Sequence, residues 1–436
     1  MGGVVLAAAA VLLAAVVAVA AAELVPVTDK DLESEASLWS LYQRWLSVYN
    51  GSLDLVEKPS RFDTFKENAR HINEFNKRED EPYKLGLNQF SDLTEEEFDS
   101  GMYTGAMLPE DAGNVSLSSS TVDDDKLLAS AAGKVPAKWD WRRHGAVTPV
   151  KNQRNCGAEL LGFLDGGFCG GINAIKTGKL RTLSEQEVLD CSGAGTCKGG
   201  DPYRAFDHAI SPGLALDQHG NPPYYPAYVA EKKKCRFNPR KPVVKINGKR
   251  MMRDTTEAQL LCRVYKQPVL VAIEANRAFS RYSKGVFTGP CGTRLNHAVL
   301  VVGYGTTANG VDYWIVKNSW GKGWGENGYI RMKRNVGTKA GLCGIYKTPM
   351  YPIKNKMISR RRKIIGYTPC TAPRADPPWI EATYPEKERT FEVFKANARS
   401  STARTAVARG EADVMGDDAS YSGASHEQPP VTAACR

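Results

Sequence analysis

The sequence predicts an α+β fold made of a helical N-terminal domain followed by a larger domain of mixed helices and strands. Residues 39–76 carry apolar side chains at the spacing of amphipathic helices. Short apolar runs rich in β-branched residues, typical of strands, follow at 269–273, 298–302 and 313–316. The length of 436 residues exceeds one average domain, so we expect two folded units with tails.

The first 22 residues have the composition of a secretory signal. An apolar, Ala-rich run ends in small residues at Ala20 and Ala22, which predicts cleavage after Ala22. A membrane anchor is the alternative, but the run is short and no later stretch is apolar enough to span a bilayer. We therefore expect a soluble mature chain in the secretory pathway, whose ten cysteines form disulfides rather than zinc sites.

Charge is distributed unevenly along the chain. The net charge is −12 over residues 23–134, +19 over residues 135–354 and +3 over residues 355–436. An acidic segment beside a basic one indicates that the two bind each other, and acid is then expected to weaken their association. Nucleic-acid binding is the alternative use of a basic domain, but its Lys and Arg residues are dispersed and no nucleic-acid module accompanies them.

Six residues of the N-terminal domain recur at steps of four, four, three, four and four positions, which places them along one side of a helix. A short extended stretch with distinctive Gly, Asn, Phe and Asp positions follows ten residues later. Together the two runs resemble the inhibitory prodomain of papain-like, cathepsin L-like proteases, which implies that residues 23–104 inhibit the rest of the chain. The matching positions are Glu57, Arg61, Phe65, Asn68, Ile72 and Asn76, then Gly86, Asn88, Phe90 and Asp92.

The resemblance continues along the chain. Residues 105–134 are rich in Ser, Ala, Gly and Asp and indicate an exposed linker, where this family is processed. Residues 135–354 are similar to the mature protease, which has an α+β, papain-like two-lobed fold. A helical left lobe packs there against a right lobe built on an antiparallel β-barrel, and the active site lies in the cleft between them. Residues 183–187 agree locally, because they indicate a short capped helix.

The same resemblance implies three disulfides. The pairs are Cys156 with Cys197, Cys191 with Cys235, and Cys291 with Cys343. Cys262 lies in a helical stretch and is expected to be a buried free thiol.

Peptide hydrolysis by this family needs a thiolate, an imidazole, a group that orients the imidazole and an oxyanion hole. By resemblance, Gln153 is the side-chain donor of the oxyanion hole, His297 is the general base and acid, and Asn318 orients the imidazole. Trp320 and Trp324 match the aromatic residues that shield this bond. A lone His before an apolar strand is more often structural, so the assignment depends on the surrounding motifs.

The nucleophile is missing from the motif that should hold it. In the family, the segment after Cys156 continues with Gly, Ser or Ala, Cys and Trp, whereas here Glu159 stands at the cysteine position. A glutamate cannot form the acyl-enzyme thioester, so the chain as written is expected to be inactive as a peptidase. Cys169 cannot replace the nucleophile, because ten further residues of helix correspond to about 15 Å.

The genetic code offers an explanation for this break. Codons exist for Glu159 to Phe168 that, translated one base later, give Ser-Cys-Trp-Ala-Phe-Ser-Thr-Val-Ala, which is the family motif. Residues 158–170 are therefore interpreted as an out-of-frame segment, through sequencing error, gene modelling or a real pair of indels. Gly162, Gly166, Gly167, Gly170 and Gly171 support this interpretation, because each costs about 1 kcal/mol relative to Ala inside a helix.

The remaining assignments also rest on the resemblance. It implies a substrate pocket lined by Gly199, Gly200, Asp201, Pro202, Ala272, Leu295 and Thr348, in which Asp201 is either a pocket residue or an ordinary salt-bridge or loop residue. The expected partners are peptide or protein substrates, the chain's own prodomain and cystatin-like inhibitors. We expect no cofactor, no metal, no nucleic acid, no membrane after signal cleavage, and a monomer in the extracellular space, lysosome or vacuole.

Residues 355–436 fall outside the resemblance to the mature protease. Residues 386–399 resemble prodomain residues 57–70, and the remainder is expected to be disordered. Two functional classes remain open. One is a cysteine endopeptidase precursor whose true frame encodes the nucleophile, and the other is an inactive papain-fold protein, or pseudogene product, that at most binds peptides.

Overall fold

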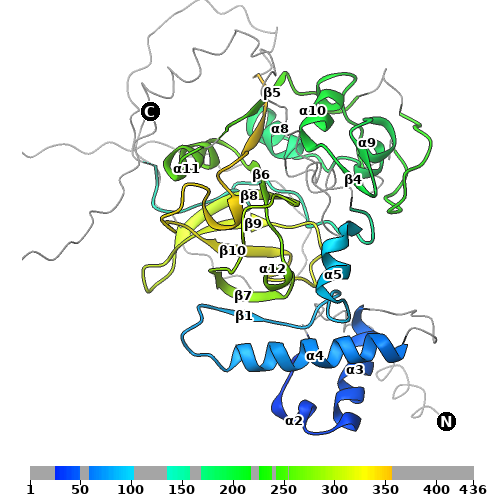
Figure 1. Cartoon of the computed structure of the whole chain (residues 1–436). Coiled ribbons are helices and arrows are strands. Elements are labelled where there is room, and N and C mark those ends of the chain that lie inside the picture. The colour runs from blue at the N-terminus through cyan, green and yellow to red at the C-terminus, as the bar shows by residue number, and fades with distance from the viewer. Residues whose placement is uncertain are drawn as a thin grey trace, which may run out of the picture. The chain divides into compact units, whose positions relative to one another are not determined.

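A computed structural model describes two regions of the chain, which we name by their residues (Figure 1). The N-terminal domain comprises residues 25–102 and the second domain residues 135–355. The predicted signal (1–22), Glu57, the linker (105–134), Glu159 with most of the segment 158–170, and the tail beyond 355 lie outside the described residues. The residues that the structure describes are 25–49, 58–102, 135–157, 168–217, 225–237, 242–253 and 255–355.

Three helices form the core of the N-terminal domain: α2 (Asp29–Leu32), α3 (Glu35–Tyr49) and α4 (Lys58–Asn76). Trp45 of α3 and Phe65 of α4 are fully buried against each other, with ring centroids 5.2 Å apart. The predicted positions from Arg61 to Asn76 all lie in α4, as their spacing indicated. Strand β1 (Tyr83–Leu85), helix α5 (Glu95–Glu97) and a π-helical turn, η1 (Phe98–Met102), follow.

The large sheet of the second domain has the strand order β1-β7-β10-β9-β8-β6-β11-β5, and β2 pairs with β8. The predicted strands at 269–273, 298–302 and 313–316 are confirmed as β6, β8 and β9. The expectation of a closed antiparallel barrel is wrong for the described residues, because this strand order has two ends and β10 pairs with β7 in parallel. The strand bounds are β2 (Trp139–Asp140), β5 (Gly248–Met251), β6 (Val269–Ile273), β7 (Tyr282–Phe287), β8 (His297–Thr306), β9 (Asp312–Lys317), β10 (Tyr329–Lys333) and β11 (Met350–Ile353).

Strand β6 shows why the central strands are continuously apolar. Val269, Val271 and Ile273 join a core that the sheet shares with the N-terminal domain, whereas Leu270 joins the core under the helices. Alternate side chains of a strand point to opposite faces, so a strand covered on both faces needs apolar residues at every position.

Helices α8, α9 and α10 pack on the other face of this sheet and form the left lobe, where Figure 1 labels them together. Ser184 caps the predicted short helix, since its side chain accepts a hydrogen bond from the Glu187 amide. The elements of the second domain outside the sheet are α8 (Cys169–Thr177), α9 (Glu185–Cys191), β3 (Gly195–Thr196), β4 (Gly199–Gly200), α10 (Pro202–Ile210), α11 (Glu257–Lys266), α12 (Arg277–Ser280) and the 3₁₀ turn η3 (Leu342–Gly344).

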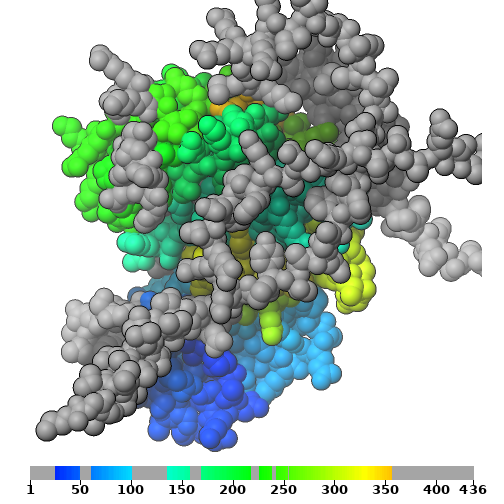
Figure 2. Space-filling model, turned by 180° about the vertical axis from the view of Figure 1, so that it is seen from behind, coloured from blue at the N-terminus to red at the C-terminus, as the bar shows by residue number. Residues whose placement is uncertain are grey.

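Strand β1 of the N-terminal domain extends this sheet, because it pairs antiparallel with β7 of the second domain. The contact requires a glycine at position 285, which has φ +96° and where a Cβ would lie 2.3 Å from the Pro82 carbonyl oxygen. Figure 2 shows the two domains from behind, with the N-terminal domain in blue. The N-terminal domain is thus joined to the second domain by backbone pairing as well as by a shared apolar core.

The three implied disulfides are present in the structure: Cys156–Cys197, Cys191–Cys235 and Cys291–Cys343. The expectation for Cys262 is wrong, because this residue is disulfide-bonded rather than free. Among the described cysteines, Cys169 is the free thiol and is buried. Disulfides are typical of proteins that fold in the secretory pathway.

Two glycines at the start of α8 have a packing reason that the sequence pattern did not reveal. A Cβ at position 170 would lie 2.2 Å from the Arg181 carbonyl oxygen, and one at position 171 would lie 2.5 Å from the Ala146 carbonyl oxygen. These two glycines therefore permit close backbone packing, and their helix penalty alone does not indicate a faulty segment.

Within the part of the chain that the structure describes, no helix has the length and apolarity needed to cross a membrane. The same residues hold no group of three or more His, Cys, Asp or Glu side chains placed to bind a metal ion.

Candidate functional site

His297 begins strand β8 at the centre of the candidate site, where its side chain is fully buried. Its Nε2 atom lies 2.9 Å from Oδ1 of Asn318, which follows the end of β9. Oδ1 also accepts a hydrogen bond of 2.8 Å from the Ser319 amide, which identifies it as the carbonyl oxygen of the side chain. Because that oxygen can only accept, Nε2 of His297 carries the proton and Nδ1 is the nitrogen that can take one.

Two tryptophans shield the His297–Asn318 bond. The indole of Trp320 stacks on the His297 ring at 4.6 Å with an interplanar angle of 20°. Trp324 packs edge-on against Trp320 at 5.2 Å and donates a hydrogen bond of 2.8 Å to the Ser280 carbonyl oxygen. A bond kept dry in this way holds the imidazole more firmly than one exposed to water.

Gln153 lies beside the same loop. Its backbone amide donates to the Ser319 carbonyl oxygen at 2.8 Å, and its side-chain oxygen accepts from the Ser319 hydroxyl at 2.6 Å. The amide group Nε2 donates weakly to the Cys156 carbonyl oxygen at 3.3 Å. Gln153 is thus bonded to Ser319, the residue that directly follows Asn318. The predicted oxyanion donor and the residue predicted to orient the imidazole therefore belong to one hydrogen-bonded unit.

Lys151 anchors this unit to the left lobe. Its ammonium group lies 2.8 Å from a Glu185 carboxylate oxygen and 2.5 Å from a carboxylate oxygen of Asp217, and both carboxylates are buried. The Lys151 carbonyl oxygen accepts from the Gly321 amide at 2.8 Å. Sequence reasoning missed this ion pair network, because Lys151, Glu185 and Asp217 are far apart in the chain and no local pattern shows that their side chains meet.

Glu159 lies outside the described residues, so its place relative to His297 stays a prediction. The chain on its N-terminal side is fixed by the Cys156–Cys197 disulfide and by the Gly157 amide, which donates to the Cys197 carbonyl oxygen at 2.9 Å. On the other side Cys169 is buried in the core, and burial raises the pKa of its thiol to about 12. A buried, protonated thiol is a poor nucleophile, which agrees with the expectation that Cys169 does not replace the missing cysteine.

The predicted pocket residues fall into two groups. Gly199, Gly200, Asp201 and Pro202 lie in β4 and at the start of α10. Asp201 is the N-cap of α10, and its carboxylate accepts hydrogen bonds from the amides of Tyr203 at 2.8 Å and Arg204 at 3.3 Å. A carboxylate used as a helix cap, with Arg204 3.4 Å away, favours the structural alternative for Asp201.

Of the second group, Ala272 lies across the sheet next to the start of β8, and Leu295 lies just before it in the chain. Ala272 of β6 pairs with Ala298, which directly follows His297, and Leu295 precedes His297 by two residues. The Thr348 hydroxyl is buried without a hydrogen-bond partner. That the two groups line one substrate pocket remains a prediction from the resemblance.

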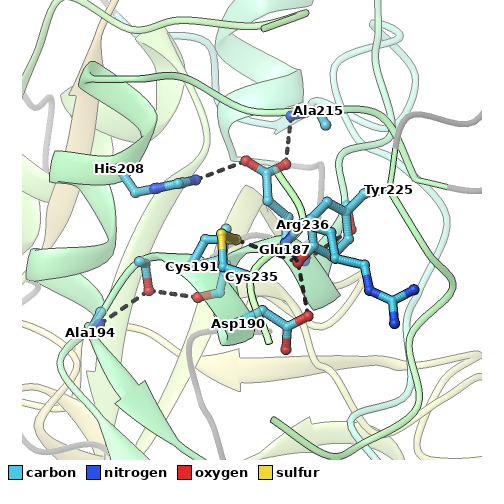
Figure 3. A network of polar contacts seen from close by, with 12 residues as sticks. Glu187, Asp190, Cys191, Ala194, His208, Ala215, Tyr225, Cys235 and Arg236 are labelled. Atoms are coloured by element: carbon cyan, nitrogen blue, oxygen red, sulfur yellow. Dashed lines mark hydrogen bonds and ion pairs between the residues drawn. A yellow bond between two sulfur atoms is a disulfide. The ribbon is translucent and has the colours of Figure 1, made fainter. Parts of the chain in front are cut away.

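A polar network joins α9 and α10 in the left lobe (Figure 3). The buried Glu187 carboxylate accepts from the Ala215 amide at 2.6 Å and lies 2.8 Å from Nε2 of His208. Burial raises the pKa of Glu187, and the bonds to His208 and Ala215 oppose this effect. Nearby, Tyr225 donates to Asp190 at 2.9 Å beside the Cys191–Cys235 disulfide.

The N-terminal domain packs directly on the aromatic shield. The rings of Phe90 and Phe98 lie edge-on against Trp320, at 4.9 and 5.9 Å. The Gln89 side chain donates to the Trp320 carbonyl oxygen at 2.8 Å, and the Asn88 side chain donates to the Ser280 carbonyl oxygen at 2.7 Å. The predicted stretch 86–92 therefore lies against the wall of the site, and Phe98, which the motif did not include, is part of the same contact. The expectation that this stretch is extended is wrong for residues 89–92, which form turns closed by the bonds from the Ser91 amide to Asn88 and from the Leu93 amide to Phe90.

Two family matches cover both domains. Residues 135–353 match the papain family of cysteine proteases, and residues 42–98 match the cathepsin propeptide inhibitor domain. Among curated proteins, the chain is similar to the thiol protease SEN102 of Hemerocallis, with 44% identity over 338 residues that cover 76% of this chain and 91% of that protein. Vignain of Vigna mungo is 45% identical over 331 residues, which cover 75% and 88%.

Solved structures show the same two-domain arrangement. The recombinant stem bromelain precursor matches with a TM-score of 0.62 and 42% identity, covering 73% of this chain and 99% of that one. The proform of Amb a 11, a ragweed pollen cysteine protease, matches with a TM-score of 0.65 and 36% identity, covering 76% and 99%.

Proposed function

Because the chain belongs to the papain family of cysteine proteases, as a cysteine endopeptidase precursor with a propeptide inhibitor domain, we propose that His297, Asn318 and Gln153 are its catalytic apparatus. The observation that carries this proposal is the 2.9 Å contact between His297 and Asn318 beneath Trp320. With Nε2 engaged by Asn318, Nδ1 of His297 is the atom that withdraws the proton from a nucleophile and later returns it to the leaving amine. The Gln153 amide group stabilises the developing oxyanion.

Residue 159 is the position of the nucleophile. In the chain as written, Glu159 there supplies no thiolate, and acyl transfer stops before its first step. We favour a frame-shifted segment 158–170 over a genuinely inactive homologue, because the remaining catalytic groups and the inhibitory domain are all retained. Sequencing genomic DNA and transcript through these codons tests this point, and a confirmed frame would leave the inactive, peptide-binding alternative.

The N-terminal domain inhibits the second domain by covering it next to the catalytic histidine. Its contacts with Trp320 are made by Gln89, Phe90 and Phe98, and β1 holds it in register. We further propose that the enzyme is a monomer, that it acts on peptides or proteins, and that cystatin-like inhibitors bind it. The linker is cut and the mature enzyme acts in the extracellular space, lysosome or vacuole. Residues 1–22, 105–134 and 355–436 keep their predicted roles as signal, processed linker and tail.

The catalytic roles are tested in a chain whose segment 158–170 is replaced by the frame-shifted family segment. His297→Ala in that chain removes the base and should abolish peptide hydrolysis while leaving the three disulfides and the far-ultraviolet circular dichroism unchanged. Hydrolysis that survives this substitution would show that His297 is not the catalytic base.

A further inference from the structure

Two arginines of the second domain converge on one atom of the N-terminal domain. Arg277 lies in α12 and Arg281 immediately follows that helix, four positions later. The Nη2 atom of Arg277 donates to Oδ1 of Asn68 at 2.9 Å, and Nη2 of Arg281 donates to the same oxygen. Two guanidinium groups therefore share a single neutral acceptor, where a carboxylate is the usual partner.

The neutral acceptor follows from a second task of Asn68. Its Nδ2 group donates to the carbonyl oxygens of Ser91 at 2.7 Å and Leu93 at 3.1 Å, which fixes the turns at 89–92 next to the site. A carboxylate at position 68 would place an acceptor oxygen against these two carbonyl oxygens. The N-terminal domain thus cannot offer a negative charge from this side chain without losing its own internal bonds.

In the docked state, few hydrogen bonds and no close carboxylate in the described part of the chain therefore compensate for the burial of the positive charge on these arginines. Arg281 is only 2% exposed, and its Nη1 atom is buried without a hydrogen-bond partner, as is Nε of Arg277. Among the described residues no carboxylate lies within 4.0 Å of Arg281, and Glu95 approaches Arg277 only to 3.8 Å. Burial, followed by repulsion from Arg277, lowers the pKa of Arg281 to about 9. A buried cation without a counter-ion opposes the contact that buries it.

We propose that Arg277 and Arg281 form a binding site for an oxyanion, that is, a carboxylate or an inorganic sulfate or phosphate, which opens when the N-terminal domain leaves. Paired guanidinium groups present several donors in fixed directions and match an acceptor with two or more oxygens. Both arginines start from a turn held within the second domain, because the Asn276 side chain caps α12 and the Ser280 carbonyl oxygen accepts from the Trp324 indole. The site depends on the two-domain arrangement and not on the catalytic assignments.

Docking of the N-terminal domain and binding of an oxyanion then exclude each other. An anion that binds only the undocked state raises the undocked population by the factor 1 + [anion]/Kd, which is about tenfold at nine times Kd. The site is thereby a point at which an acidic partner or a high oxyanion concentration releases the inhibitory domain.

Hydrogen exchange of the full chain measures this release directly. The Gly86 amide donates to the Arg281 carbonyl oxygen at 2.9 Å, and the Val286 amide donates to the Pro82 carbonyl oxygen at 2.9 Å, so both bonds cross between the domains. Exchange at these amides is followed at pH 7 and constant ionic strength, with sodium chloride replaced stepwise by sodium sulfate, sodium phosphate or sodium acetate.

Sulfate or phosphate should accelerate exchange of both amides in a saturable, dose-dependent way. A parallel effect of acetate identifies carboxylates as ligands, whereas an effect of sulfate and phosphate alone restricts the site to inorganic oxyanions. Arg281→Gln should slow exchange of the two amides in chloride and remove their response to sulfate. Arg277→Gln, at a more exposed position, should also remove the response to sulfate. The matched control is Arg294→Gln, which removes an exposed interdomain ion pair with Asp99 and should keep the response.

The proposal is overturned if sulfate, phosphate and acetate act no differently from chloride at equal ionic strength. It is equally overturned if the response persists in both Arg277→Gln and Arg281→Gln.

Discussion

The imidazole of His297 is held by Asn318 through a contact of 2.9 Å between Nε2 and Oδ1, and this single bond fixes which ring nitrogen can act as a base. The Ser319 amide occupies the same oxygen at 2.8 Å, so the Asn318 side chain cannot turn without losing two bonds. The orientation of the His297 ring is therefore set by Asn318 together with the stacked indole of Trp320.

Replacing Asn318 by Ala in the chain with the restored segment should lower kcat about 100-fold with little change in KM, because a misplaced base affects the chemical step rather than binding. Steady-state hydrolysis of a fluorogenic peptide measures both constants. Asn309→Ala, in an exposed loop, is the matched control and should leave them unchanged. A large rise in KM at constant kcat would instead assign Asn318 to substrate binding.

The protein with the sequence as written, including Glu159, should neither hydrolyse peptides nor react with thiol-directed epoxide inhibitors. Glu159 has no thiol, and the Cys169 thiol is buried with a pKa of about 12. The mass of the intact native protein after incubation with the epoxide is the measurement. Addition of one inhibitor molecule at Cys169 would show that this thiol is accessible and reactive after all.

Acid should loosen the N-terminal domain, and His71, an exposed residue of α4, is a group whose protonation acts in this direction. Partial desolvation, followed by Arg281, Arg277 and Arg78, lowers the pKa of His71 in the docked state. The docked state then binds fewer protons than the undocked one, so docking is constant above the ordinary pKa of about 6.5 and weakens as pH falls below it. Asp99 acts in the opposite direction, since burial raises its pKa despite Arg294.

Exchange of the Gly86 amide between pH 7 and pH 5, corrected for intrinsic rates, measures this effect. His71→Gln should flatten the dependence, whereas His144→Gln, in the second domain, should leave it unchanged. If the acid response in His71→Gln is undiminished, the cause is instead the opposite net charges of the two segments. The individual interdomain ion pairs are exposed and weak.

Gly285→Ala should weaken docking by about 1 to 3 kcal/mol, because the added Cβ meets the Pro82 carbonyl oxygen and the left-handed backbone is strained. The matched control is Gly310→Ala, which also has a positive φ but no atom within 4 Å of the added Cβ. Faster exchange of the Gly86 amide in the first variant alone is the expected outcome. Equal effects in the two variants would mean that backbone strain, and not the interdomain contact, is responsible.

Much of the fold was predictable because its signals are local. The runs at 269–273, 298–302 and 313–316 became β6, β8 and β9, and the six-residue pattern marked α4. Sheet closure was not predictable, since it depends on which edge strands meet, and in the structure β1 of the N-terminal domain pairs with β7. The state of Cys262 could not be inferred from one helical stretch, because pairing depends on distant chain segments.

The site was predictable only as far as motifs reach. Gln153, His297 and Asn318 each belong to a recognisable run, and the structure brings them together through Ser319. Asp201 looked like a pocket residue in a linear motif, but its carboxylate caps α10. Arg277 and Arg281 gave no signal at all, because their significance comes from Asn68, more than two hundred residues earlier.

The most direct test of the account is to restore the cysteine. Residues 158–170 are replaced by the frame-shifted family segment, and hydrolysis of a fluorogenic peptide by the acid-treated protein is compared with that of the chain as written. We predict turnover only in the restored chain. This turnover should fall in proportion to the fraction of the new cysteine that an epoxide inhibitor has labelled. A restored chain that forms the three disulfides yet neither hydrolyses peptide nor takes up the inhibitor would contradict the assignment of a cysteine endopeptidase site to His297, Asn318 and Gln153.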